Sequence, residues 1–582
     1  MTDAARRELL FEAAKSVREA FVKYNDNFGR ITRRAKQRFE ARDWRGAERD
    51  FSERLELYTK SVDRQVAALQ RLLGPPARTR ELWPLLKQTF GARVDGIPDG
   101  AFSKTFFNSI SRRIFQTVGI DPETEFHDIR FNIRDAQRHV LECRSYLNWG
   151  DLRELLRQLL NDCDFAVPYA DFEGDVSRIE HDIEHYAAQD GAAADELLRL
   201  DFLPAVFYQS ARAYLIGKVF WDAREAPLVI ALRNDDDGIK VDQIMMSVDE
   251  ISILFGFTRS YFFADLEPVE GAVYFINSLL PHKPIDELYT VLGRIRQGKT
   301  ERYRQFSNHL ATCHDRFVHA PGDRGLVMIC FTLPSYDLVF KVIRDKFGFP
   351  KNTSRQEVME KYQFVFRHDR AGRLIDTQEF MDIEFPLAKF EPAVLEELLD
   401  EAAESARVEG DMLVLKHLYV ERRLRPLNLF VREAPRAAAE AAVIDYGQAL
   451  RDLAYANIFP GDLLIKNFGV TRHGRCIFYD YDELCLVTDC NFRELPESPF
   501  EEDEMRPRPW FHVNANDVFP EEFIRFLAFD DGLKQVFAAR HADLLTVEFW
   551  REVQRHHLAA QGSERRGPPH AQPRPRARPA FS

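Results

Sequence analysis

Three polar residues in the last quarter of the chain have the types and the spacing of a phosphoryl-transfer site. Asp462 is followed five positions later by Asn467, which is the Asp-x-x-x-x-Asn spacing of a protein-kinase catalytic loop. Asp480 ends an apolar segment, where a kinase keeps its metal-binding aspartate. We expect Asp462 to accept a proton from an attacking hydroxyl, and Asn467 and Asp480 to hold Mg²⁺, which prefers oxygen ligands. Each residue taken alone would also fit an ordinary backbone cap near a turn.

The segment between Asn467 and Asp480 predicts a hairpin. Thr471 to Gly474 is polar and ends in glycine, which is typical of a tight turn between two strands. A turn centred between His473 and Gly474 would place Asn467 directly opposite Asp480. Opposed side chains in an antiparallel pair lie about 5 Å apart at Cβ, so both could reach one cation.

Further upstream, a glycine-containing loop and a lysine are suited to holding a nucleotide. Two glycines precede an apolar strand, and glycines let backbone N–H groups approach phosphate oxygens closely. Lys341 stands inside the apolar run 338–343, where a lysine either reaches the phosphates or lies at a strand edge with its amine in water. Glu357 or Glu360, on a helical stretch that follows, could pair with it. The residues that we assign to this ATP site are Ala320, Pro321, Gly322, Asp323, Arg324, Gly325, Leu326 and Lys341.

Two further segments belong to the predicted site. Tyr419 to Glu421 read as a strand leaving into a loop, with Pro426 beyond, and we expect a hinge there that presents backbone groups to adenine. Asp376 follows a predicted hairpin at 370–372, and from the residues alone it fits a turn position.

Bulk properties narrow the class of protein. The chain has 582 residues, of which 45% are hydrophobic and 30% charged, so we expect a globular protein of two or more domains. The formal net charge of −13 argues against a general nucleic-acid or membrane-surface role. No apolar run approaches the roughly 20 residues of a membrane helix. The seven cysteines are scattered, which favours reduced thiols in a cytoplasmic protein.

The pattern of the chain changes near residue 310, and the fold class that it predicts is α+β. Residues 1–310 are predicted to be a mainly helical domain with a single β interruption at 228–232, followed by a hairpin turn at 234–238. Residues 311–562 are predicted to be a kinase-like domain of two lobes. Residues 563–582, rich in Pro, Arg and Gly, are predicted to be a disordered basic tail. The predicted strands of the second domain are 325–333, 338–343, 362–366, 412–420, 442–445 and 475–481, with a helix at 391–408.

Three stretches resemble a known family. They are 331–341 (FTLPSYDLVFK), 373–380 (RLIDTQEF) and 457–462 (NIFPGD), and together with the length and the helical first half they resemble bacterial isocitrate dehydrogenase kinase/phosphatase. The resemblance covers nearly the whole chain except the tail. It implies a bifunctional enzyme that phosphorylates a serine of isocitrate dehydrogenase with ATP, removes that phosphate again, and so directs isocitrate between the citric acid cycle and the glyoxylate bypass.

The resemblance also implies roles for residues and ligands. One kinase-like site would serve both reactions, with adenine nucleotides shifting the balance and Mg²⁺ or Mn²⁺ as the metal. Ala320 to Leu326 and Lys341 would bind ATP, Asp462 would be the kinase base, and Asn467 and Asp480 would hold the metal. Asp376 would be needed for the phosphatase reaction. A homodimer is compatible with these expectations.

The chain departs from ordinary protein kinases in three places. The loop has two glycines instead of three, Pro460-Gly461 replaces the His-Arg of His-Arg-Asp, and Asp480-Tyr481-Asp482 replaces Asp-Phe-Gly. Without that arginine, a phosphorylated activation loop has no anchor, which points to regulation through the first half. Two other functions remain open: a small-molecule phosphotransferase of kinase-like fold, and a nucleotide-binding scaffold without turnover.

Overall fold

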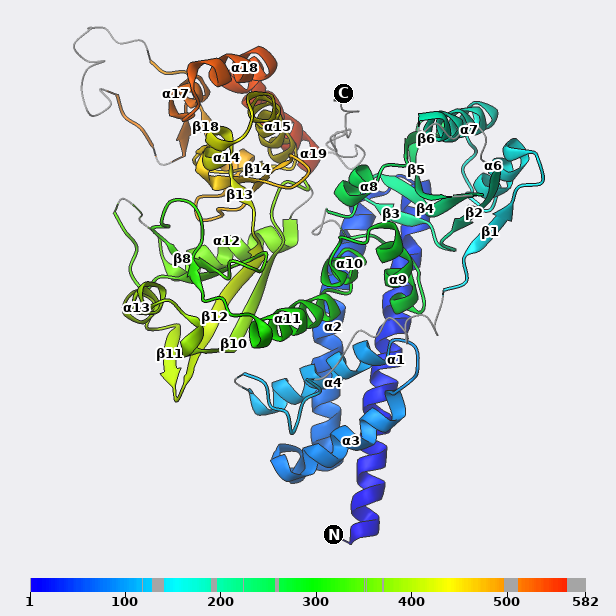
Figure 1. Cartoon of the computed structure of the whole chain (residues 1–582), viewed down its shortest axis with the longest axis vertical. Coiled ribbons are helices and arrows are strands. Elements are labelled where there is room, and N and C mark those ends of the chain that lie inside the picture. Colours follow the sequence, from blue (N-terminus) through cyan, green and yellow to red (C-terminus); the bar gives the residue numbers. More distant parts are fainter. Residues whose placement is uncertain are drawn as a thin grey trace. The chain divides into compact units, whose positions relative to one another are not determined.

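The chain forms two compact units, Met1–Cys313 and His314–Ser582 (Figure 1). The computed structural model describes residues 2–117, 119–127, 141–189, 196–222, 224–256, 261–349, 351, 353–368, 371–496, 511–514 and 516–562. The predicted tail over 563–582 lies outside the described residues. Among the helices that are described, none combines the length and the apolar character needed to span a bilayer.

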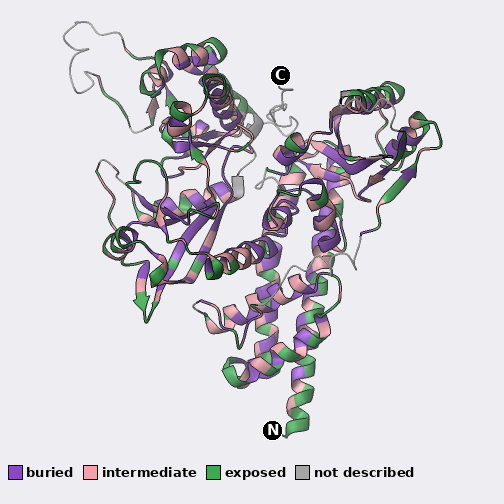
Figure 2. Cartoon of the chain, in the orientation of Figure 1, coloured by how far each residue is buried: buried purple, intermediate pink, exposed green. Residues whose placement is uncertain are grey.

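Long amphipathic helices open the first unit. In α1 (Asp3–Glu40) the buried positions recur every three or four residues, as at Leu10, Ala14, Val17 and Phe21, which gives the helix one apolar face. Figure 2 shows buried and exposed residues alternating along this helix. The other described helices of the unit are α2 (Trp44–Leu73), α3 (Trp83–Val94), α4 (Gly100–Phe115), α6 (Leu152–Asn161), α7 (Phe172–Gln189), α8 (Val248–Leu254), α9 (Val269–Leu279), α10 (Ile285–Val291) and α11 (Ile295–Thr312).

The first unit also holds a six-stranded antiparallel sheet, so the expectation of a single β interruption is wrong. The strand order is β1-β2-β4-β5-β6, with β3 paired to β4. Short strands with mixed polar and apolar residues resemble helix faces in sequence, and only β5 stood out as an apolar run. The predicted turn after β5 is confirmed, because Asp235 pairs with Gly238. The strands are β1 (Arg144–Leu147), β2 (Leu197–Phe202), β3 (Phe207–Gln209), β4 (Arg212–Trp221), β5 (Glu225–Asp235) and β6 (Gly238–Met245).

The second unit begins with another six-stranded antiparallel sheet. Its order is β10-β12-β9-β8-β7, with β11 paired to β12, so β9 and β12 lie at its centre. The predicted strand at 338–343 coincides with β9, and that at 412–420 lies within β12. The strands are β7 (Val318–His319), β8 (Met328–Thr332), β9 (Leu338–Ile343), β10 (Thr377–Pro386), β11 (Ala406–Glu409) and β12 (Met412–Arg422).

Two predicted strands of the second unit are helical instead. Residues 362–366 belong to α12 (Arg355–His368) and residues 442–445 to α15 (Arg436–Tyr455). Both are short apolar runs, which periodicity alone does not assign to helix or strand. The predicted helix at 391–408 ends early, as α13 (Pro392–Glu401), and gives way to β11.

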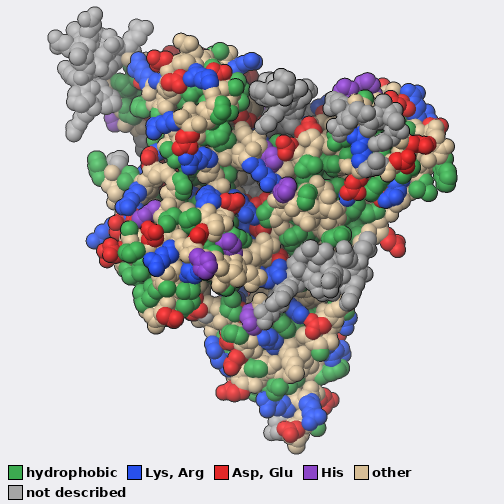
Figure 3. All heavy atoms as spheres, in the orientation of Figure 1, with side chains coloured by type: hydrophobic (Ala, Val, Ile, Leu, Met, Phe, Trp, Pro, Cys, Tyr) green, Lys and Arg blue, Asp and Glu red, His purple; other side chains and the backbone are tan. Residues whose placement is uncertain are grey.

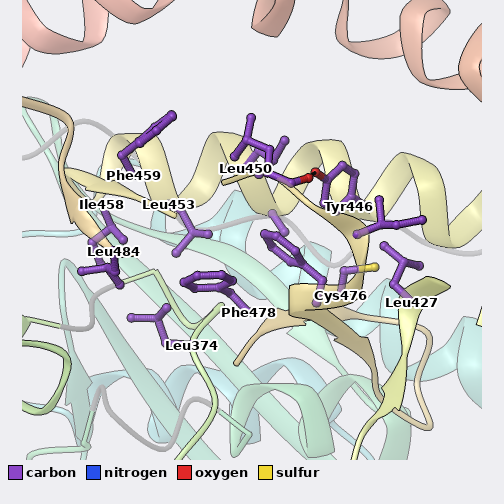
Figure 4. Packing of buried hydrophobic residues seen from close by; sticks show 14 of the residues in the cluster. Leu374, Leu427, Tyr446, Leu450, Leu453, Ile458, Phe459, Cys476, Phe478 and Leu484 are labelled. Atoms are coloured by element: carbon purple, nitrogen blue, oxygen red, sulfur yellow. Dashed lines mark hydrogen bonds between the residues drawn. The ribbon is translucent and has the colours of Figure 1, made fainter. Parts of the chain in front are cut away.

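The rest of the second unit packs around α15. Leu450 and Leu453 of this helix belong to the same apolar core as Phe478 and Leu374, and Leu453 points toward Phe478 (Figure 4). Acidic and basic side chains are interspersed on the face of the molecule drawn in Figure 3. The remaining elements are β13 (Arg425–Pro426), α14 (Leu427–Glu433), β14 (Ile458–Phe459), β15 (Phe468–Val470), β16 (Cys476–Phe478), β17 (Cys485–Leu486), β18 (Asn491–Phe492), β19 (Asp517–Val518), α17 (Phe523–Phe526), α18 (Asp531–His541) and α19 (Val547–Gly562).

Candidate active site

A short hairpin of β15 and β16 supports the site. The turn between the strands holds three residues, closed by a hydrogen bond from Thr471 N–H to Arg475 O, and ends at Gly474 with φ of 74°. A three-residue turn shifts the register by one relative to the two-residue turn that we predicted. Asn467 lies opposite Tyr479, whose N–H donates to the Asn467 carbonyl over 3.1 Å. The predicted placement of Asn467 opposite Asp480 is therefore wrong.

Asp462 and Asn467 do come together. The 3₁₀ turn Ile465–Asn467 carries the chain round between them, and the Asn467 amide donates a short hydrogen bond to the Asp462 carboxylate. Burial, followed by the Glu483 carboxylate, raises the pKa of Asp462 to about 6, while Lys351 works in the opposite direction. A carboxylate with that pKa is ionised at neutral pH and is basic enough to accept a proton in a transfer step.

Asp480 lies two residues beyond β16, in a cluster of charges. Burial and the adjacent carboxylate of Asp482 raise the pKa of Asp480 well above its ordinary value. Burial acts to raise the pKa of Asp482 as well, but its hydrogen bond with Asp480 and the ammonium of Lys351 lower it. Lys351 Nζ lies 3.1 Å from Asp482 Oδ2 and 2.5 Å from Glu483 Oε1. The two aspartates and Lys351 therefore form one cluster of interacting charges, in which each carboxyl group changes the pKa of the other.

Lys341 is buried at the centre of the second sheet and is not an edge residue. Only 5% of Lys341 is exposed, and its Nζ lies 2.5 Å from Glu421 Oε1 and donates to the Tyr479 carbonyl over 2.9 Å. Burial acts to lower the pKa of Lys341, but the negative groups around it, Glu421 foremost, outweigh that effect and raise it. The lysine is therefore charged and lies next to the segment that carries Asp480. Neither Glu357 nor Glu360 is its partner.

The predicted hinge at Tyr419–Glu421 is wrong. These residues lie within β12, where Tyr419 pairs with Lys341 on one side and with Glu379 on the other. Their backbone groups therefore belong to the ladder of a central strand. The chain leaves the sheet only after Arg422, where β12 ends.

The glycine-containing loop joins β7 to β8. Residues 321–326 are exposed, and Gly322 has φ of 117°, a conformation that favours glycine. A Cβ added to Gly325 would lie 2.7 Å from the Met328 carbonyl oxygen, so the backbone turns too closely there for any side chain. Arg344 Nε donates to the Gly325 carbonyl over 3.0 Å and fixes the base of the loop.

Asp376 precedes β10 and lies beside the hairpin. The segment before it runs alongside β16: Ile375 N–H donates to Phe478 O over 3.1 Å, and the Tyr481 hydroxyl donates to Ile375 O over 2.9 Å. Glu421 is close enough for the charge of Asp376 to raise its pKa, although burial is the larger cause. Asp376 is thus in the same part of the unit as Lys341. Residue 370 of the turn predicted before it, at 370–372, lies outside the described residues.

The oxygen donors of the site suit a hard cation. Asp480 offers a carboxylate, and Asn467 keeps an amide oxygen while its nitrogen binds Asp462. In the described part of the chain, no three His, Cys, Asp or Glu side chains are grouped as ready metal ligands. Each of these two donors would suit Mg²⁺, because that ion commonly takes one or two protein ligands and completes its shell with water and phosphate oxygens.

Two residues of the site were not predicted in the roles that they have. Glu421 contacts Lys341 from a strand 80 positions later, and Lys351 contacts Asp482 from 131 positions earlier. Such pairs have no signal in local spacing. The sequence offers one weak signal for Glu421. It follows the predicted strand 412–420 and stands two residues after Tyr419, so its side chain is expected on the same face of the sheet as that of Tyr419.

Comparisons with known proteins match both units. Residues 315–565 match the model of the isocitrate dehydrogenase kinase/phosphatase (AceK) kinase domain, and residues 14–314 match that of the regulatory domain of the same family.

Relatives with the name isocitrate dehydrogenase kinase/phosphatase are similar over almost their full length. One from Anaeromyxobacter sp. (strain Fw109-5) is 46% identical over 544 residues, covering 93% of this chain and 94% of the relative. One from Xanthomonas axonopodis pv. citri (strain 306) is 44% identical over 547 residues, covering 93% of each chain. Similarity of this extent includes both units and the whole of the site.

Proposed function

The chain belongs to the isocitrate dehydrogenase kinase/phosphatase family, and we propose that the site around Asp462, Asp480 and Lys341 carries out both of its reactions. The chain is a kinase and phosphatase of isocitrate dehydrogenase, and as a kinase it uses ATP. The observation that carries the assignment to this site is the hydrogen bond from Lys341 to the carbonyl of Tyr479, because it joins the predicted nucleotide end to the predicted metal end.

In the kinase direction, Asp462 accepts the proton of the target serine hydroxyl as that oxygen bonds to the γ-phosphorus of ATP and ADP leaves. The Asn467 amide, through its hydrogen bond, fixes the orientation of the Asp462 carboxylate. Lys341 neutralises phosphate charge, and the backbone of residues 320–326 covers the phosphates. Asp480 and Asn467 would hold Mg²⁺ or Mn²⁺, which supplies charge neutralisation between the phosphates.

In the phosphatase direction, Asp376 orients or activates the water that attacks phosphoserine. The position of Asp376 supports this role, because the segment that carries it is hydrogen-bonded along β16, the strand that leads to Asp480. One site therefore serves both reactions with different carboxylates.

The second unit is proposed to be a two-lobed kinase-like domain. The lysine lies on the third strand of its first sheet in chain order, and α12 follows that strand, as in protein kinases. The first unit, which matches the family's regulatory domain, is proposed to act in regulation by adenine nucleotides.

The test is transfer of label from [γ-³²P]ATP to purified isocitrate dehydrogenase, followed by a chase with ADP or AMP. The wild type should put label on a serine and then remove it. D462A and D480A should each lower the rate at which label is incorporated into isocitrate dehydrogenase by at least about a hundredfold, since each removes a group that acts in the transfer step. D489N, at an exposed carboxylate nearby, is the control and should behave like the wild type.

Three results would overturn the proposal. A near-normal rate of label incorporation into isocitrate dehydrogenase by D462A or D480A would mean that the reacting groups lie elsewhere. ATP turnover without isocitrate dehydrogenase, and no label on it, would indicate a small-molecule phosphotransferase. Nucleotide binding without any turnover would indicate a scaffold.

A further inference from the structure

We propose that Glu421 is the positioning residue that holds Lys341 against the ATP phosphates, a task that protein kinases give to a glutamate of the helix after the lysine strand. The inference rests on the proposed role of Lys341 as a phosphate ligand.

The strand register brings the two residues onto one face of the sheet. β12 lies between β9 and β10, with Tyr419 opposite Lys341 and Glu421 opposite Thr377. Glu421 and Tyr419 are two positions apart, so their side chains point to the same face. Glu421 is therefore the diagonal neighbour of Lys341, a separation that long side chains cross.

Both oxygens of the Glu421 carboxylate have a partner. Oε1 lies 2.5 Å from Lys341 Nζ, and Oε2 accepts a hydrogen bond of 3.0 Å from the Thr377 hydroxyl. Only 2% of Glu421 is exposed. A buried carboxylate is held in place only when its charge and lone pairs are satisfied, and here the two partners fix its rotation as well as its position.

The ammonium of Lys341 is left with one direction in which to donate. It has three N–H bonds, of which one is directed to Glu421 and one to the Tyr479 carbonyl. Because Tyr479 immediately precedes Asp480, these two acceptors hold the ammonium group beside the segment that carries Asp480, with one N–H bond left for another acceptor. That is the position in which a phosphate oxygen would be bound.

Helix α12 does not supply the carboxylate. Its inward face presents Val358, Tyr362 and Val365, all buried, and the Tyr362 ring stacks on Tyr419 with centroids 4.0 Å apart. Glu357 and Glu360 are exposed: Glu357 accepts a hydrogen bond from Ser354 N–H, and Glu360 accepts one from Gln356. The lysine is thus fixed within the sheet, independently of the helix.

The experiment compares the affinities for ADP and adenosine in the full-length protein by isothermal titration calorimetry. Only ADP carries phosphates, so the ratio of the two affinities reports on phosphate contacts and cancels general damage to the fold. E421Q should lower that ratio about tenfold, because a charge-assisted contact to the lysine is lost. T377V should lower it by about threefold and T377S should not, because serine keeps the hydroxyl.

E357Q and E360Q are the matched controls and should leave the ratio within about twofold of the wild type. If a glutamate of α12 positioned Lys341 instead, one of these two variants would lower the ratio. K341M separates the inference from the proposed function. If K341M lowers the ratio but E421Q and T377V do not, Glu421 is not the positioning residue. If K341M leaves the ratio unchanged, Lys341 does not bind phosphate and both proposals fail. Should E421Q not fold, the comparison of T377V with T377S decides.

Discussion

Gly461 stands immediately before Asp462, where ordinary protein kinases have the arginine of His-Arg-Asp. Its φ is 89°, and a Cβ added there would lie 2.5 Å from both the Cβ and the carbonyl oxygen of Glu483. The lack of a side chain therefore lets the loop of the proposed base touch the segment that follows Asp480. Close backbone packing takes the place of an arginine contact.

Replacing Gly461 by alanine should therefore displace Asp462. We expect G461A to lower kcat of the kinase by about a hundredfold, the scale of effect of a shift of about 1 Å at a reacting group. The control is G410A, because Gly410 has φ of 62° but nothing within 4 Å of the added Cβ. G410A carries the backbone strain without the collision, and it should keep kcat within about twofold. Equal losses in the two variants would show that strain alone is responsible.

Asp376 provides a second test at the level of one side chain. D376A should lower the rate of phosphate removal from phosphorylated isocitrate dehydrogenase by at least about a hundredfold, the range of a lost acid–base group. Kinase activity should stay within a few fold, because the proposed mechanism gives this side chain no part in the forward transfer. Both rates are measured on one preparation, with D376N as the variant of similar volume. Parallel loss of both activities would point to a structural role instead.

At the scale of elements, α13 and β9 together fix the glycine-containing loop. Arg344, directly after β9, bonds the Gly325 carbonyl and also forms ion pairs with Glu397 and Glu401 of α13. Glu397 lies 2.5 Å from His319 Nε2, just before the loop begins. Both ends of the loop are therefore attached to one helix.

We expect R344M to raise the KM of the kinase for ATP by about tenfold, with a smaller effect on kcat, since the loop would lose its fixed path before binding. E401Q is the control: the Glu401 side chain is 54% exposed, and its ion pair should contribute little. Steady-state kinetics at varied ATP would measure both. An unchanged KM in R344M would mean that the loop does not depend on this anchor.

Elements with a strong local signal were predictable from the sequence, and the details of the site were not. The strands that carry Lys341 and Glu421 were found from their apolar runs. The spacing of Asp462 and Asn467 pointed to a common site, and the structure joins the two by a hydrogen bond. The apolar runs at 362–366 and 442–445 were assigned to strands because neither has a decisive period over so few residues. The register of the hairpin depended on a turn of three residues rather than two, which composition did not distinguish.

At the scale of the whole molecule, each unit has its own buried core, and the first unit contains a pH-sensitive carboxyl. Glu301 of α11 is fully buried, accepts a hydrogen bond of 3.1 Å from Gln297 and pairs with Arg304. Burial nevertheless raises its pKa to about 7 from an ordinary value of 4.5. Between pH 4.5 and about 7 the folded unit therefore keeps this carboxyl protonated, whereas the unfolded chain has released the proton. Stability is lost as the pH rises through this window, by on the order of 3 kcal/mol.

E301Q removes this dependence, because glutamine is neutral at every pH. Scanning calorimetry should show two transitions, and the one that belongs to the first unit is the one that E301Q changes. This transition should fall in temperature from pH 5 to pH 8 in the wild type, and less steeply in E301Q. E12Q, at an exposed position of α1, should follow the wild type. Identical slopes in the wild type and E301Q would show that Glu301 is ionised throughout.

The hydrogen bonds that tie residues 373–375 to β16 restrict how the enzyme can choose between its two reactions. Phe478 N–H donates to Arg373 O over 2.8 Å and Ile375 N–H donates to Phe478 O, so Asp376 and Asp480 are carried by one pair of joined backbones. A movement of one of these backbone segments would therefore carry the other with it. We therefore expect the direction of phosphate transfer to depend on which nucleotide and which form of the serine is bound, and not on a separation of these two backbone segments.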